Sequence, residues 1–236
     1  MKKALQIGGI VSGVVLICFG IGATVLGVKG GNTVNSNLSQ EFITGSPDMT
    51  PSAIEPEIKS IQAAQQKIAA DQKKANVEPL TFTTVEAPSC SVAGEHVNDG
   101  SSALCFGKYM RIHALGASNG LTYSQMGRYT AKTDAPVAST DFNGGTNDPQ
   151  YAEIDAKTGQ PVSNGARDLW VTETSLTTAL YLAYTGSAIS LFGIVVGVAL
   201  LLAGVGFLIL ALGGAIQRVP LTKEKVEGQA ATAGGS

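Results

Sequence analysis

The chain has 236 residues, and its 14% of charged residues lies well below the quarter that is usual in a soluble domain. Hydrophobic residues make up 44% of the chain, but they gather at its two ends. The stretch 29–186 carries 11 basic and 16 acidic residues, a net charge of −5. A basic stripe is missing from it, so the sequence argues against nucleic acid as a partner.

The first apolar stretch follows the two basic residues Lys2 and Lys3. It runs from Ala4 to Val28, 25 residues without a charge. A secretory signal has an apolar core of only about 7–15 residues. The length therefore predicts an uncleaved transmembrane helix, and the alternative is a signal peptide cut after Ala23.

The second apolar stretch, Ser187–Ile216, is the strongest signal in the chain. From Ile189 to Leu212 only Ser190 is polar, and this run of 24 residues exceeds the roughly 20 that cross a bilayer core. In hydrocarbon every backbone amide must be paired within the segment, so the run must be helical. The sequence predicts a second transmembrane helix here.

Basic residues lie next to each predicted span, on the side of the nearer chain terminus. Basic flanks stay on the cytoplasmic side of a membrane. We therefore expect a protein of the cell membrane with both termini in the cytoplasm. The predicted organisation is a cytoplasmic N-terminus at 1–3, a first span at 4–28, an extracytoplasmic domain at 29–186, a second span at 187–216 and a cytoplasmic tail at 217–236.

Glycines recur on one face of each predicted span. Steps of four and seven residues keep a side chain on one side of a helix. Such small-residue stripes let helix backbones approach closely in lipid, either within one chain or against another membrane protein. The alternative is that glycine is simply frequent in membrane helices. The packing candidates are Gly9, Gly13, Gly20, Gly27, Gly193, Gly197 and Gly204.

The middle domain is predicted to be mostly helical. Ile58, Ile61 and Ile68 recur at helical spacing within 56–75, opposite a face of glutamine and lysine. The stripe is narrow, so this helix needs one partner. The other expectations, in chain order, are a tether at 30–51, a short extended segment at 80–85, a helix at 101–114, a further helical turn at 123–129, a loop at 134–165 and helical character from 167 to 184.

Cys90 and Cys105 lie in the domain that we expect outside the membrane, where thiols are oxidised. A disulfide between them closes a loop of about 15 residues and adds roughly 3 kcal/mol in the chain-entropy model. Zinc is the rival interpretation, but the spacing contains no C-x2-C half-site. The sequence predicts the disulfide and leaves Cys18, in the first span, without a partner.

Four runs of residues carry a resemblance to a known family. They are A-G-E-H-V-N-D-G at 93–100, Tyr109 followed by I-H at 112–113, G-L-T-Y at 120–123 and A-R-D-L-W-V-T-E-T-S-L-T-T-A-L at 166–180. In this order, and with a span at each end, the chain resembles a family of actinobacterial two-span membrane proteins that often carry the label "aromatic ring-opening dioxygenase". The resemblance implies a two-span architecture, and its label implies iron-dependent ring opening.

The dioxygenase label implies a specific set of iron ligands. Extradiol ring opening uses two histidines and one carboxylate on iron, with open positions for the reactants. The chain has only two histidines, so His96 and His113 would both be ligands, with Glu95 or Asp99 as the carboxylate. The alternative is that both histidines are ordinary polar residues of a loop and a helix. The residues alone assign no catalytic group, metal or cofactor.

A second weak candidate is the run D-F-N-G-G-T-N-D at 141–148, which has oxygen-bearing side chains at alternate positions, as a calcium loop does. An EF-hand requires glycine at its sixth position and glutamate at its twelfth. Here Thr146 and Ala152 stand at those positions. Ordinary turn chemistry explains the same residues.

Together these patterns predict a mainly α protein with two transmembrane helices flanking a small, disulfide-containing extracytoplasmic domain. Its expected partners are the lipid bilayer and another membrane or envelope protein, to which it would contribute contacts as a non-catalytic accessory subunit. The alternatives are an extracytoplasmic ligand-binding or sensing protein and the dioxygenase that the family label names. Pull-down of partners, detection of a bound ligand and detection of bound iron would separate the three.

Overall fold

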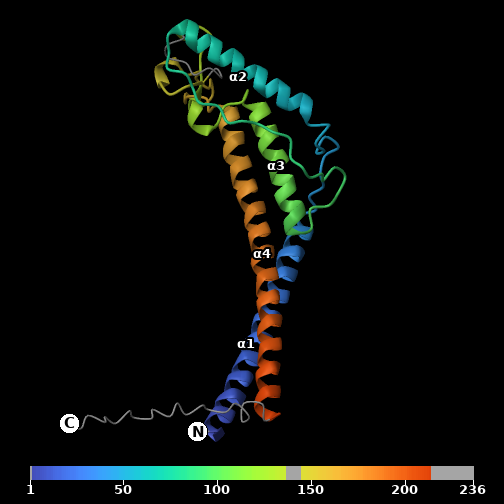
Figure 1. The fold of residues 1–236 in the computed structure, drawn as a ribbon. Coiled ribbons are helices and arrows are strands. Elements are labelled where there is room, and N and C mark those ends of the chain that lie inside the picture. The colour runs from blue at the N-terminus through green and yellow to red at the C-terminus, as the bar shows by residue number, and fades with distance from the viewer. Residues whose placement is uncertain (1, 137–144, 214–236) are drawn as a thin grey trace, which may run out of the picture. The chain divides into compact units, whose positions relative to one another are not determined.

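The computed structural model describes residues 2–136 and 145–213. It is mainly helical, as predicted, and the helices are drawn in Figure 1. In chain order the elements are α1 (Lys2–Gln40), α2 (Glu55–Ala75), α3 (Gly100–Ala117), the short 3-10 helix η1 (Tyr123–Gln125), β1 (Tyr129–Thr130), β2 (Gly145–Thr146), the 3-10 helix η3 (Pro149–Tyr151) and α4 (Gly165–Leu212).

The first and last helices are long and apolar enough to cross a membrane. With 39 residues in α1 and 48 in α4, a rise of 1.5 Å per residue makes them about 58 and 72 Å long. A bilayer core is only about 30 Å thick, so each helix continues well beyond the apolar part. The prediction of a tether from Gly30 was wrong over 30–40, because α1 extends to Gln40.

The chain divides into two compact units. The first combines Met1–Leu26 with Phe192–Ser236 and is called here the two-helix unit. The second is Gly27–Leu191, called here the central unit. The residues of each unit pack mainly with one another. Both α1 and α4 contribute one part to the two-helix unit and one part to the central unit.

In the two-helix unit, α1 and α4 run antiparallel with their glycines facing each other. A Cβ placed on Gly13 would lie 2.8 Å from the Gly204 carbonyl oxygen, and one on Gly20 would lie 2.7 Å from the Gly197 oxygen. Side chains of any size are therefore excluded at these positions, and the two backbones contact each other. Of the seven candidate glycines, Gly13, Gly20, Gly27, Gly197 and Gly204 are buried, while Gly9 and Gly193 are half-buried.

The contact between these helices repeats every seven residues. Gln6 precedes Gly13 by seven, and its amide donates a hydrogen bond of 3.3 Å to the carbonyl of Ala211, which follows Gly204 by seven. Both Gly204 and Ala211 are buried. A strict seven-residue repeat favours a left-handed twist of two helices around each other. Ile17, Leu201 and Leu208 lie in this contact, whereas many other large apolar side chains of both helices, such as Phe19 and Phe192, are exposed.

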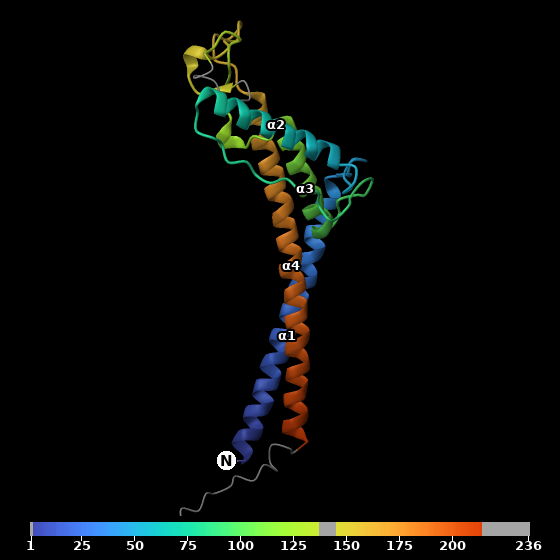
Figure 2. The ribbon, with the colours of Figure 1, turned by 45° about the horizontal axis from the view of Figure 1, so that its top comes forward.

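The core of the central unit is built on α2 and α3, and Figure 2 shows α2 crossing in front of α3. The isoleucine stripe of α2 is buried as predicted, with Ile61 1% exposed. On α3 the buried side chains include Phe106, Tyr109 and Ile112, so each helix has one apolar face turned to the core. Leu38, at the end of α1, is buried in the same cluster.

The predicted disulfide is present. Cys90 and Cys105 are bonded, with their Cα atoms 6.1 Å apart, and the bridge ties the segment before α3 to the first turns of that helix. Tyr109, one turn further along α3, donates its hydroxyl to the Cys90 carbonyl at 2.6 Å. Cys18 is a free, exposed thiol on α1.

The rest of the central unit contains little regular structure. The segment 80–85 forms no strand, and the turn expected at 123–129 is limited to η1. β1 and β2 form a two-stranded antiparallel sheet with Tyr129 opposite Thr146. Half of the calcium-loop candidate, residues 141–144, lies outside the described residues.

Candidate functional site

Three ionisable side chains from separate segments of the central unit meet beside the N-terminal end of α2. They are Asp48 in the loop after α1, Glu57 in the first turn of α2 and His113 on α3. Each side chain offers one nitrogen or oxygen atom that could bind a metal ion, and these three atoms lie within 4.8 Å of one another. We refer to them as the Asp–Glu–His cluster.

Asp48 is held by the turn in which it lies. The Met49 amide donates to the Ser46 carbonyl at 3.0 Å, which closes the turn. The Ser46 hydroxyl donates to Asp48 Oδ1. This bond holds the pKa of the Asp48 carboxyl below its usual range, against partial burial that raises it; the Asp48 backbone amide and the charge of His113 add to the lowering. The carboxylate is therefore ionised at neutral pH and fixed in orientation.

Glu57 is placed by the start of α2, where Pro56 occupies the first turn. Proline suits this position because its missing N–H would have no partner there. The positive end of the helix dipole favours a carboxylate in the first turn. On the opposite side, Gly116 of α3 leaves space for this side chain, since a Cβ at that position would overlap Glu57 Oε1.

His113 lies between the two carboxylates. Its Nδ1 is 2.9 Å from Glu57 Oε2, and its Nε2 is 3.4 Å from Asp48 Oδ2. The side chain is 28% exposed, so solvent reaches the cluster. A protonated ring can donate to both carboxylates. A neutral ring that keeps its proton on Nδ1 donates to Glu57 and turns a lone pair toward Asp48. The cluster can thus hold either a proton or a cation on Nε2.

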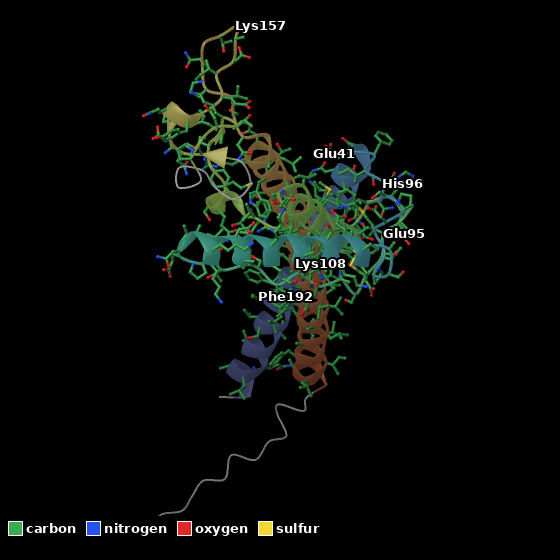
Figure 3. All side chains as sticks on the ribbon, turned by 90° about the horizontal axis from the view of Figure 1, so that it is seen from above. Glu41, Glu95, His96, Lys108, Lys157 and Phe192 are labelled. Atoms are coloured by element: carbon green, nitrogen blue, oxygen red, sulfur yellow. A yellow bond between two sulfur atoms is a disulfide. The ribbon has the colours of Figure 1, made fainter. Side chains whose placement is uncertain are left out.

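The second histidine has different neighbours. His96 is exposed, and its Nδ1 lies 3.0 Å from the Thr44 hydroxyl. Figure 3 shows it beside Glu95 at the edge of the central unit. Asp99 caps α3, where its carboxylate accepts from the Ser102 amide at 2.8 Å. Within the described residues, the donors that the dioxygenase label requires do not form one group with His113.

An apolar groove adjoins the Asp–Glu–His cluster. It has a volume of about 290 Å³ and lies between α3 and the part of α4 that belongs to the central unit. His113 forms part of its wall. The lining residues are Met110, His113, Ala114, Ala117, Leu169, Thr172, Glu173 and Leu176.

Glu173 is the buried charge of this groove, with a side chain only 3% exposed. Its carboxylate accepts from the Thr177 hydroxyl at 2.7 Å and pairs with Arg111 at 3.3 Å. The Arg111 guanidinium in turn stacks over Trp170, 4.1 Å from the ring centre. Since a buried charge is costly unless it is paired and hydrogen-bonded, this network explains how Glu173 is accommodated and how α3 is joined to α4.

The sequence singled out His113 but gave no sign of its partners. Asp48 is nine residues from Glu57, and Glu57 is 56 residues from His113, so no local spacing connects them. Glu173 lies within the run at 166–180 that carries the family resemblance, without any indication that it would be buried. The packing of α2 on α3 brings Glu57 to His113, and the turn at Ser46–Met49 adds Asp48.

Comparisons with known proteins supply no family. No protein-family model, no curated protein and no solved structure matches this chain. The resemblance to actinobacterial two-span proteins therefore stays a hypothesis.

Proposed function

We propose that this protein is a non-catalytic, two-span membrane protein whose central unit lies outside the cytoplasm and binds another membrane or envelope protein as an accessory subunit. The basic flanks of both apolar helices support this orientation. The disulfide supports an oxidising surrounding for the central unit. In the two-helix unit the glycine faces contact each other, so we expect the partner to bind elsewhere, on the central unit.

Phe42 carries the proposal. This residue is 82% exposed, more than any other large hydrophobic residue in the described part of the chain. It projects two residues after the end of α1, next to a shallow apolar groove of about 240 Å³. An aromatic side chain beside a groove is the type of residue that dominates protein–protein binding when a partner covers it. The groove is lined by Ser39, Phe42, Ile43, His96, Val97 and Asn98.

The backbone at this position adds a second argument. Phe42 has φ = 51°, in the left-handed region that glycine usually occupies after a helix. A residue with a Cβ pays roughly 1–2 kcal/mol there. A bulky aromatic that is 82% exposed buries little apolar surface in the isolated chain to offset this cost. Backbone strain of this kind is concentrated at binding sites.

The test is the variant Phe42→Gly, because it separates stability from binding. Glycine relieves the strained backbone but loses more conformational freedom on folding, so we expect the free energy of unfolding to rise by up to about 1 kcal/mol. Loss of a binding hot spot costs at least about 2 kcal/mol of association, or roughly thirtyfold in affinity. Complexes of wild type and variant are purified in mild detergent and compared by quantitative mass spectrometry. The partner recovered with the wild type should be depleted with Phe42→Gly, although this variant is at least as stable as the wild type.

The matched control is Ile154→Ala, which removes another exposed hydrophobic side chain (49%) from the central unit. It should leave the recovery of the partner unchanged. Equal recovery with Phe42→Gly and wild type would contradict the proposed surface. Recovery of no specific protein with either would contradict the accessory role.

The alternative of a ligand-binding or sensing protein is favoured by one observation, the apolar groove between α3 and α4. Small-molecule sites are typically apolar hollows with a few polar groups at fixed positions, here His113 and Glu173. Native mass spectrometry of the intact protein would reveal a bound small molecule. Filling the groove by Leu176→Trp should remove that molecule and leave the Phe42-dependent partner in place.

Ring cleavage of a catechol that is lost in His113→Ala would instead favour the dioxygenase.

A further inference from the structure

We propose that the Asp–Glu–His cluster is a binding site for a divalent first-row transition metal ion of the Zn²⁺ type. His113 Nε2 and Asp48 are its ligands, and Glu57 orients the imidazole. The site is independent of the surface around Phe42 and needs no catalytic role for the protein.

The imidazole has the arrangement of a metal ligand. A metal-bound histidine usually donates its other ring N–H to a carboxylate, which fixes the tautomer and raises the basicity of the ligating nitrogen. Glu57 Oε2 is such an acceptor, 2.9 Å from His113 Nδ1. With the proton on Nδ1, the lone pair of Nε2 is free for an ion on the side of Asp48.

Asp48 supplies the second ligand at a suitable separation. Zinc binds nitrogen and oxygen at about 2.0–2.2 Å, so two ligands of one tetrahedral ion are about 3.4 Å apart. The distance from His113 Nε2 to Asp48 Oδ2 is 3.4 Å. The Ser46 hydroxyl is bonded to Oδ1, the other oxygen, and so leaves Oδ2 for the ion. The carboxylate is thus oriented by a neighbour, as ligating carboxylates are.

Charge and space also favour a cation. Two carboxylates around a neutral imidazole carry a charge of −2, which a divalent ion neutralises. The mixed nitrogen and oxygen donors suit zinc and similar metals, whereas calcium and magnesium take oxygen ligands. Gly116 keeps α3 clear of the Glu57 carboxylate. The side chains of Asp48, Glu57 and His113 are 45%, 30% and 28% exposed, so water or a partner's side chain can complete the coordination.

The experiment is a titration of the full-length protein in detergent with ZnCl₂, followed by calorimetry, with the affinity tag removed and the disulfide intact. We expect a saturable site and a rise in Tm with added zinc. His113→Gln and Asp48→Asn each remove a ligand and should weaken binding by more than a hundredfold. Glu57→Gln and Ser46→Ala change only orienting groups, so we expect losses of about tenfold to a hundredfold.

His96→Gln is the matched control, because it removes the other histidine from an exposed loop. It should bind zinc as the wild type does. Far-UV circular dichroism and the Tm without zinc establish that each variant is folded, and Ser46→Ala keeps all three charged side chains should a ligand variant unfold. The proposal is overturned if the wild type shows no saturable binding. It is equally overturned if His113→Gln binds normally, or if His96→Gln abolishes binding.

Discussion

The close contact of α1 and α4 in the two-helix unit leads to a prediction for Gly20→Ala. The added methyl group would lie 2.7 Å from the Gly197 carbonyl oxygen and 2.8 Å from the Leu201 amide nitrogen. Both are backbone atoms, which cannot rotate away as a side chain can. The two helices themselves must therefore move apart at this level.

The size of the effect follows from these distances. Ordinary van der Waals contact of a Cβ begins at 3.4 Å, so the helices must separate by about 0.7 Å. A gap of 0.5–1 Å forfeits a quarter to a half of the attraction between atoms in contact. The loss extends to the next level of the repeat, where Gly13 faces Gly204. Overpacking of this kind costs about 1–3 kcal/mol.

In the assay, increasing SDS separates the two helices. Energy transfer between dyes on Lys3→Cys and Leu212→Cys, in a Cys18→Ser background, reports the fraction that is separated. Both labelled positions are exposed. Gly20→Ala should lower the free energy of separation by about 1–3 kcal/mol. The control is Gly22→Ala on the same helix, where a Cβ has no atom within 4 Å.

Because alanine stabilises a helix by roughly 0.5–1 kcal/mol relative to glycine, the control should be neutral or slightly more stable. If both variants behave alike, the glycine faces do not pack at the distance that the structure gives, and the reasoning is refuted.

Three further predictions concern the central unit. A membrane-impermeant maleimide should label Lys157→Cys but not Ser236→Cys in intact cells, because we place both termini inside; the opposite pattern would reverse the topology. Intact mass of non-reduced protein should show Cys90 and Cys105 linked, and replacing both by serine should cost roughly 3 kcal/mol of stability, whereas two free thiols in the native protein would be incompatible with the bridge. Burial raises the pKa of Tyr109 above 10.0, so its contribution to stability is complete below pH 10.0 and is lost as the pH rises through the folded-state pKa. Tyr109→Phe should reduce this alkaline loss and cost about 1–3 kcal/mol at neutral pH, since the Cys90 carbonyl loses its donor; an unchanged alkaline transition would count against the burial argument.

The elements that the sequence predicted correctly rest on local physical constraints. The apolar run 189–212 must be helical in hydrocarbon, whatever its neighbours are. The isoleucines of α2 repeat at helical spacing, so the face that would be buried could be read directly. The pairing of Cys90 with Cys105 required only that no other cysteine lie in the same domain.

The tether at 30–40 shows where local reasoning failed. Glycine, asparagine, serine and threonine have low helix propensity, and they dominate this segment. Tertiary contacts outweigh that preference, because Leu38 is buried in the core of the central unit and Gly30 lies against Ser190 of α4. Propensity describes the isolated segment, and packing on a neighbouring helix was not visible in it.

The sequence by itself determined two long apolar helices, a helical middle and a disulfide, because each of these depends on composition or on spacing within one segment. The tertiary structure decided which side chains of distant segments meet. Asp48, Glu57 and His113 come together only when α2 packs on α3, and Phe42 is left exposed only by the way the chain turns after α1. Contacts between residues far apart in the chain are set by how helix faces fit together, and one sequence carries no periodic signal for that fit.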